Sequence, residues 1–124
     1  MISEEDVLSI HDILIERFGG IKGIRDKASL DSALKRPYQT FESQDLYPTL
    51  IEKVSALLES IIKNHPFNDG NKRLGYTLCR LILLNNGIDI IADEGEKYDF
   101  IIQIAENKIE FAEIVNWLKN HVSE

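Results

Sequence analysis

Residues 65–73 of the chain read HPFNDGNKR and lie between two stretches with a helical pattern. From Leu50 to Ile62, apolar side chains recur every three to four residues on one face. From Leu78 to Leu84 the chain is apolar almost all round, which is typical of a central, buried helix. The stretch at 65–73 therefore predicts a loop between two core helices, and these helices favour an all-α fold.

Further helical segments extend this pair to a compact bundle of about six helices. Ser3 and the acids after it favour a helix start, and Gly19 with Gly20 favours its end. Pro37 ends a short second helix, because the residue before a proline avoids the helical region. The expected helices span residues 4–18, 30–35, 50–64, 71–86, 96–106 and 110–121, with an exposed loop or hairpin at 38–47 and a connection at 88–92.

The size and composition of the chain favour one domain over residues 1–124. Its 124 residues are 44% hydrophobic and 28% charged, which are ordinary values for a folded protein. The longest aliphatic run, residues 81–84, is far shorter than the roughly 20 residues that span a membrane. A single Cys79 excludes an internal disulfide, and the acidic N-terminus is unlike a secretory signal, so we expect a cytoplasmic protein with no membrane partner.

The charge of the chain is unevenly distributed. The net charge of −7 argues against a nucleic-acid partner, because phosphate backbones are held by clustered Lys and Arg. Residues 63–80 are different, with Lys63, Lys72, Arg73 and Arg80 against Asp69 alone. A small positive stretch in an acidic chain predicts a local anion site.

The predicted helix start at Asn71 has the features of such an anion site. A helix N-terminus directs unpaired backbone N–H groups and the positive end of its dipole toward the preceding loop. Lys72 and Arg73 add positive charges in the first turn, where they are unfavourable for the helix itself. Their presence suggests that a bound anion offsets them.

Two further residues complete the outline of a phosphoryl-transfer site. Asp69 supplies an oxygen ligand suited to Mg²⁺, which commonly uses one or two protein carboxylates together with phosphates and waters. His65 supplies an imidazole, a group that ordinarily titrates near neutral pH and can take a proton from an attacking hydroxyl. Base, metal ligand and phosphate cradle therefore fall within one short loop.

Each of these residues, taken alone, also has a structural interpretation. A histidine can end a helix, an aspartate–glycine pair can form a turn, an asparagine can cap a helix, and two cations can belong to a solvated face. Phe67 is expected to be buried under both the functional and the structural interpretation, and to anchor the loop to the core. His11, on the apolar stripe of the first helix, is expected to be a satisfied core histidine, and Cys79 to pack in the core.

The sequence HPFNDGNKR resembles the motif of the Fic/Doc family and is closest to the pattern HxFx[D/A]xNKR of its Doc (death-on-curing) branch. The stretches that resemble the framework of that branch are GIRDKASLDSALKRPYQTF (23–41), LYPTLIEKVSALLESIIKNHPF (46–67), NNGIDI (85–90) and AENKIEFAEIVNWLKNH (105–121). The resemblance implies a Fic/Doc-type helical fold and an enzyme that uses ATP and Mg²⁺.

The resemblance also implies a role for each matching position of the loop. By it, the site consists of the base His65, the structural anchor Phe67, the magnesium ligand Asp69, the anion hole at Gly70 and Asn71, and the phosphate contacts Lys72 and Arg73. The segment 36–48 would correspond to the flap, which pairs a target strand by edge hydrogen bonds.

Two positions depart from the pattern of AMP-transferring Fic enzymes, HxFx[D/E]GNGRxxR. Lys72 stands at its second glycine, where a side chain crowds the anion hole, and Tyr76 stands at its last arginine. By resemblance to the Doc branch, we favour transfer of the γ-phosphate of ATP to a Ser/Thr hydroxyl of a protein. AMP transfer is the alternative, supported by Gly70 and Pro66, and a non-catalytic helical interaction module is the alternative of another class.

The sequence contains no match to the inhibitory motif [S/T]xxxE[G/N] that restrains many Fic-type enzymes. A separate antitoxin protein is therefore expected, as in the toxin–antitoxin pairs that this branch resembles. The resemblance implies that the target is translation elongation factor Tu and that the activity inhibits translation.

Overall fold

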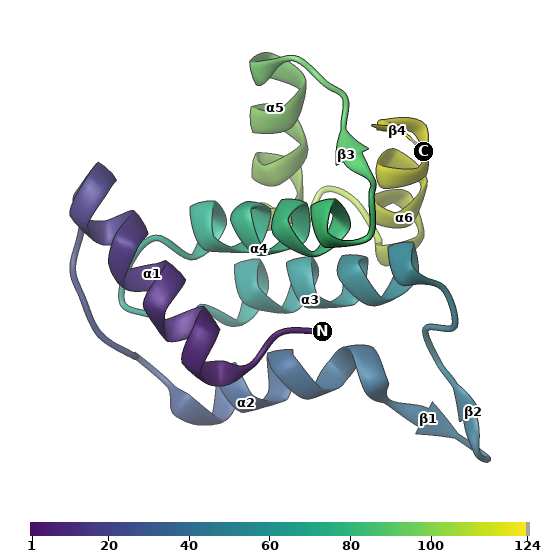
Figure 1. Ribbon diagram of the computed structural model, residues 1–124, viewed down its shortest axis with the longest axis horizontal. Coiled ribbons are helices and arrows are strands. Elements are labelled where there is room, and N and C mark those ends of the chain that lie inside the picture. The colour runs from purple at the N-terminus through teal and green to yellow at the C-terminus, as the bar shows by residue number, and fades with distance from the viewer. Residues whose placement is uncertain (124) are drawn as a thin grey trace.

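The computed structural model describes residues 1–123, and its helices follow the order expected from the sequence (Figure 1). They are α1 (Glu4–Phe18), α2 (Lys27–Lys35), α3 (Leu50–Asn64), α4 (Asn71–Asn85), α5 (Glu94–Ala105) and α6 (Phe111–Asn120). Short strands β1 (Thr40–Phe41), β2 (Gln44–Asp45), β3 (Asp89–Ile90) and β4 (Val122–Ser123) and a 3₁₀ helix at Arg36–Tyr38 complete the described elements. The prediction of an all-α fold with about six helices is confirmed.

Side-chain caps set the residues at which most helices begin. Ser3 and Thr49, at the predicted starts of α1 and α3, accept hydrogen bonds from backbone N–H groups three residues later. The helices α2 and α5 begin earlier than the predicted residues 30 and 96, because Asp26 and Asp93 cap them in the same way. Local capping chemistry therefore explains both the correct and the incorrect helix starts.

The centre of the fold is α3, which packs against α2, α4, α5 and α6. Its residues 54–62 are buried in succession. The helix α4 approaches it closely at Gly75, where an added Cβ would lie 3.1 Å from Ile62 Cγ1. The expectation that α4 is buried all round was wrong, because Leu81 and Leu84 are partly exposed to solvent.

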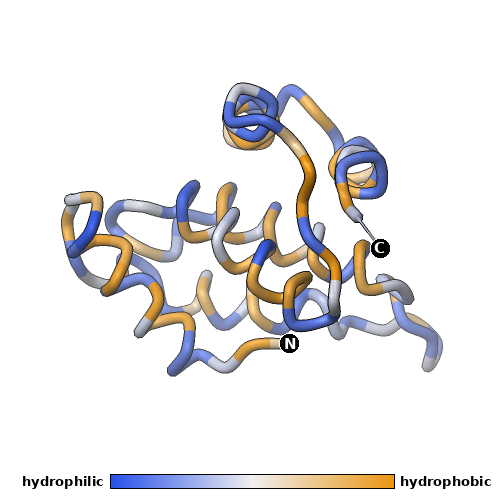
Figure 2. Tube along the Cα trace, turned by 45° about the horizontal axis from the view of Figure 1, so that its top comes forward, coloured by the Kyte–Doolittle hydropathy of each residue, from blue (hydrophilic) through white to orange (hydrophobic). Residues whose placement is uncertain are grey.

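Hydrophobic and hydrophilic residues alternate along the helices, as Figure 2 shows, so each helix has one face for the core. Within residues 1–123, no helix is both long and apolar enough to cross a bilayer.

Two strand pairs join segments at the edges of the helical body. The antiparallel pair β1–β2 forms the hairpin that was one of the two alternatives for residues 38–47, and it projects from the helices in Figure 1. Glu42 and Ser43 form its turn with positive φ angles of 51° and 68°. The antiparallel pair β3–β4 was not predicted, because it joins the connection at 88–92 to residues beyond α6.

Candidate active site

The loop at residues 65–70 begins where α3 stops. His65 has φ 49° and ψ 59°, a left-handed conformation that few residues other than glycine adopt, and its side chain is exposed. The guanidinium of Arg25 donates to the carbonyl of His65 at 2.6 Å and to that of Asn64 at 2.7 Å. Arg25 therefore binds carbonyl groups that the end of a helix leaves without partners.

The backbone of the segment 22–26 runs beside this loop and fixes its path. The N–H groups of Arg25 and Asp26 both donate to the carbonyl of Pro66, at 2.8 Å and 3.1 Å. The N–H of Asn68 donates to the carbonyl of Gly23 at 3.0 Å. This segment, which connects α1 to α2, thus supports the candidate site.

Asn71 closes the loop from the inside. Its Oδ1 accepts a hydrogen bond from the N–H of Phe67 and its Nδ2 donates to the carbonyl of Phe67, both at 3.0 Å. The same Nδ2 lies 3.5 Å from Nδ1 of His65. Because an amide nitrogen can only donate, Asn71 is the donor in this long contact. The side chain of Asn71 is thus used within the loop, and only its backbone N–H remains for an anion.

Phe67 and His11 join the loop to the core. Phe67 is buried, and its ring stacks on that of His11 with centroids 3.9 Å apart. The Nε2 atom of His11 donates to the carbonyl of Asp69 at 2.8 Å. His11 is thus a buried, hydrogen-bonded histidine, as the sequence predicted, and it also holds the backbone of the candidate metal ligand.

Asp69 keeps an exposed carboxylate beside the turn that follows α1. Its Oδ2 accepts the N–H of Ile21 at 3.2 Å and its Oδ1 accepts the N–H of Gly70 at 2.9 Å. A Cβ on Gly20 would lie only 2.8 Å from Oδ2, so glycine lets the two segments meet. An ionised carboxylate has further lone pairs, which leaves Asp69 able to bind Mg²⁺. No group of three or more potential His, Cys, Asp or Glu ligands occurs in residues 1–123.

The N-terminus of α4 is open, in contrast to the helices that a side chain caps. Gly70 is its N-cap, with φ 75° and no side-chain hydrogen bond. Leu74 is the first residue whose N–H bonds back, to the carbonyl of Gly70. Lys72 and Arg73 are exposed in this first turn, and the guanidinium of Arg73 lies 4.1 Å from the centre of the Phe18 ring.

A cavity of about 430 Å³ lies beside this helix end, a size suited to a small-molecule ligand. On one side it is lined by Asp69, Gly70, Asn71, Lys72, Arg73 and Tyr76, and on the other by Glu94, Lys97, Tyr98, Ile101 and Ile102 of α5. His65 and Phe67 do not line it. The α5 wall was missed by the sequence analysis, because no local pattern shows that residues 94–102 fold back onto α4.

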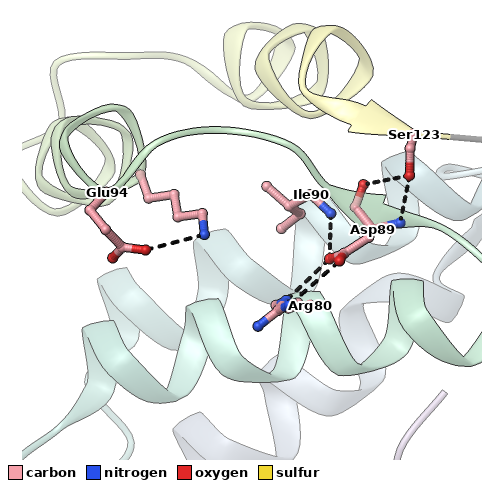
Figure 3. Close-up of polar contacts among 6 residues, drawn as sticks. Arg80, Asp89, Ile90, Glu94 and Ser123 are labelled. Carbon is pink, nitrogen blue, oxygen red and sulfur yellow. Dashed lines mark hydrogen bonds and ion pairs between the residues drawn. The ribbon is translucent and has the colours of Figure 1, made fainter.

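The positive stretch at 63–80 divides into paired and unpaired cations. Lys63 lies 3.1 Å from Glu59, and Arg80 binds Asp89 through Nε at 3.1 Å (Figure 3). The hydrogen bond to Asp89 raises the pKa of Arg80, and the same bond lowers the pKa of Asp89. Among the described residues, Lys72 and Arg73 are therefore the cations of this stretch that have no ion-pair partner, and they are the two that the sequence predicted to contact an anion.

The model of the Fic/DOC family matches residues 1–83, about two thirds of the chain. This chain belongs to the Fic/DOC family. The matched residues include the whole loop, the first turn of α4 and the supporting segment 22–26, whereas α5 lies beyond them.

Two curated Fic/DOC relatives support the Doc branch. Toxin Doc of Mycolicibacterium smegmatis is 40% identical over 92 residues, which cover 74% of this chain and 68% of that protein. Protein kinase doc of Escherichia phage P1 is 27% identical over 118 residues, which cover 95% of this chain and 92% of that protein. This Fic/DOC chain is therefore similar to the second relative over nearly its full length.

Proposed function

We propose that this protein is the toxin of a toxin–antitoxin pair and acts as a protein kinase, transferring the γ-phosphate of ATP to a Ser or Thr hydroxyl. One observation carries the proposal. The N-terminus of α4 has no side-chain cap, and within residues 1–123 its two cations, Lys72 and Arg73, form no ion pair. Beside an open cavity in an acidic chain, this arrangement suits the phosphate chain of a nucleotide.

Each residue of the loop has a role in this proposal. The backbone N–H of Asn71 and the side chains of Lys72 and Arg73 bind phosphate oxygens, and the N–H of Gly70 joins them when it exchanges its bond to Oδ1 of Asp69 for a phosphate oxygen. Asp69 would hold Mg²⁺, which would supply positive charge to offset that of the phosphates. Phe67 anchors the loop, and His65 accepts the proton of the attacking hydroxyl from its exposed position at the edge of the site.

The relatives support the kinase and toxin parts of the proposal by their names, Protein kinase doc and Toxin Doc. We propose translation elongation factor Tu as the protein substrate, inhibition of translation as the result, and the cytoplasm as the place of action. A separate antitoxin would restrain the enzyme, because the sequence contains no match to the inhibitory motif.

Label transfer tests the reaction. The purified protein is incubated with Mg²⁺ and ATP labelled at the α or the γ phosphate, with elongation factor Tu or a cell extract as acceptor. Transfer from the γ position alone is expected, and loss of that transfer in His65→Ala. Transfer from the α position alone means AMP transfer, and label transfer that survives His65→Ala in a folded variant rejects His65 as the base.

Expression in cells tests the toxin role and the antitoxin. Growth should stop when the protein is expressed alone and resume when the product of the neighbouring gene is expressed with it. Growth that continues during expression of the active protein alone contradicts the toxin role. A protein that binds the same partner but transfers no label would instead be a non-catalytic interaction module.

A further inference from the structure

The α5 wall of the cavity contains a further cation. Lys97 lines the same cavity as Lys72 and Arg73. Its side chain is only 20% exposed, although lysine side chains are mostly found in water. Most of the Lys97 side chain is therefore covered, and its charge lies at the wall of the cavity.

Burial disfavours the charged form of Lys97, but the neighbouring Tyr76 hydroxyl and Glu94 carboxylate outweigh it and raise the pKa of Lys97. Lys97 lies in the first turns of α5, near the positive end of the helix dipole, where a cation is unfavourable. Its ion pair is with Glu94 at 3.5 Å, drawn in Figure 3, and the Glu94 side chain is 95% exposed. Such an exposed pair on one helix contributes little to stability.

A second group, on the α4 side of the same cavity, lacks a hydrogen-bond partner. The Tyr76 hydroxyl is buried and forms no hydrogen bond with any described residue. The ammonium of Lys97 lies 5.8 Å from the centre of the Tyr76 ring. A tyrosine hydroxyl both accepts and donates, so it can accept from the Lys97 ammonium and donate to an oxygen of a ligand that the ammonium also binds.

We propose that Lys97 is a third phosphate-binding cation of the site, acting with the Tyr76 hydroxyl on the phosphate chain of the nucleotide. The inference rests on the proposed function and deepens it, because it adds α5 to a site otherwise formed by α4 and the preceding loop. When the nucleotide binds, Lys97 exchanges its contact with Glu94 for phosphate oxygens. Glu94 is then a counter-charge that competes with the nucleotide.

Calorimetric titration with Mg·ATP tests this in the full chain. Lys97→Met removes the charge but keeps the apolar stem, and it should weaken binding about tenfold, as the loss of one charge-assisted contact does. Lys97→Arg should restore most of the affinity. Lys119→Ala, which removes an exposed lysine of α6, is the matched control and should bind as the wild type does.

Two further measurements separate a phosphate contact from a structural role. Inorganic tripolyphosphate should compete with ATP less effectively in Lys97→Met than in the wild type, with the thermal midpoint unchanged. Glu94→Gln should have the opposite effect and tighten the binding of both, because it removes a negative charge from the cavity wall.

The outcomes distinguish the two proposals. If Lys97→Met binds ATP and tripolyphosphate as the wild type does while Lys72→Ala binds them more weakly, Lys97 is not a phosphate contact and the proposed function stands. If the wild type binds neither ATP nor tripolyphosphate, both proposals fail. If Glu94→Gln weakens binding, Glu94 is not a competing counter-charge and the inference is overturned.

Discussion

The cations in the first turn of α4 have no ion-pair partner among the described residues, whereas the cation nearer its C-terminus has one. At the N-terminus, Gly70 offers no side-chain cap, and Lys72 and Arg73 lack an ion-pair partner within residues 1–123. Toward the C-terminus, Arg80 is held by Asp89, whose backbone lies in β3 beside β4 (Figure 3). One helix therefore has a closed end that joins elements of the fold and an open end beside a cavity. The difference teaches that an unneutralised cation, rather than a cation as such, indicates a ligand site.

The largest effect is expected at the open end, for His65→Ala. If the imidazole accepts the proton of the attacking hydroxyl, its removal should lower label transfer by at least about 100-fold. The thermal midpoint should change little, because the side chain is exposed and its one polar contact, to Asn71, is long at 3.5 Å. Quantitative phosphorimaging and a thermal melt measure the two properties.

Backbone strain at residue 65 needs its own control, because His65 has a positive φ of 49°. His65→Asn serves this purpose, since asparagine tolerates the left-handed conformation and its amide cannot act as a base. Both variants should lose transfer equally. Normal activity in His65→Asn would show that the left-handed turn matters and the imidazole does not.

Features of the fold that depend on residues close together in the sequence were predictable. The cap at Ser3, the break at 65–66 and the helix start at Asn71 follow from local rules of capping and proline placement. The loop could therefore be placed between two helices from the chain alone. The extent of the domain, residues 1–124, stays a prediction.

Features that depend on residues far apart in the sequence were not predictable. Arg25 binds carbonyls about 40 positions away, and β3 pairs with β4 across the whole of α5 and α6. Arg80 and Asp89 lie in separate segments of the sequence, and the positive charge of residues 63–80 includes Arg80 without its partner. Only the fold shows which cations are neutralised and that α5 forms a wall.

The second largest effect is expected for the buried side chain of Asn71, at the N-terminus of α4. Asn71→Ala should lower the free energy of unfolding by about 2–4 kcal/mol, because the buried N–H and C=O of Phe67 both lose their partner. Urea denaturation followed by circular dichroism measures it. Asn68→Ala is the matched control, an exposed asparagine of the same loop with one bond of 3.3 Å, and its loss should be much smaller. Equal losses would mean that the Asn71 side chain does not hold the loop.

A pair of single substitutions contrasts the two ends directly. Lys72→Ala should weaken Mg·ATP binding about tenfold. It should leave the thermal midpoint unchanged or slightly higher, because a cation in the first turn is unfavourable for the helix. Arg80→Ala should leave ATP binding unchanged and slightly lower the thermal midpoint, because it removes the ion pair with Asp89. If both variants lose ATP affinity to the same degree, long-range charge explains binding and the distinction between the two ends is wrong.

The smallest effect is a pH dependence at the closed end. The hydrogen bond from Arg80 is the main cause that lowers the pKa of Asp89 below its ordinary value of 3.8. Because the folded pKa is the lower one, the stabilisation is fully present above the unfolded value and is lost as the pH falls through the folded value. The stability difference between the wild type and Asp89→Asn should therefore be constant from about pH 7 to 5 and disappear in acid below 3.8. The control is Asp12→Asn, at an exposed site on α1, which measures the general effect of acid on stability. The stability difference could instead persist after the carboxylate is protonated. Asp89 would then act through its bond to Ser123 or through the β3–β4 pair, and its ion pair with Arg80 would not be what stabilises this end of α4.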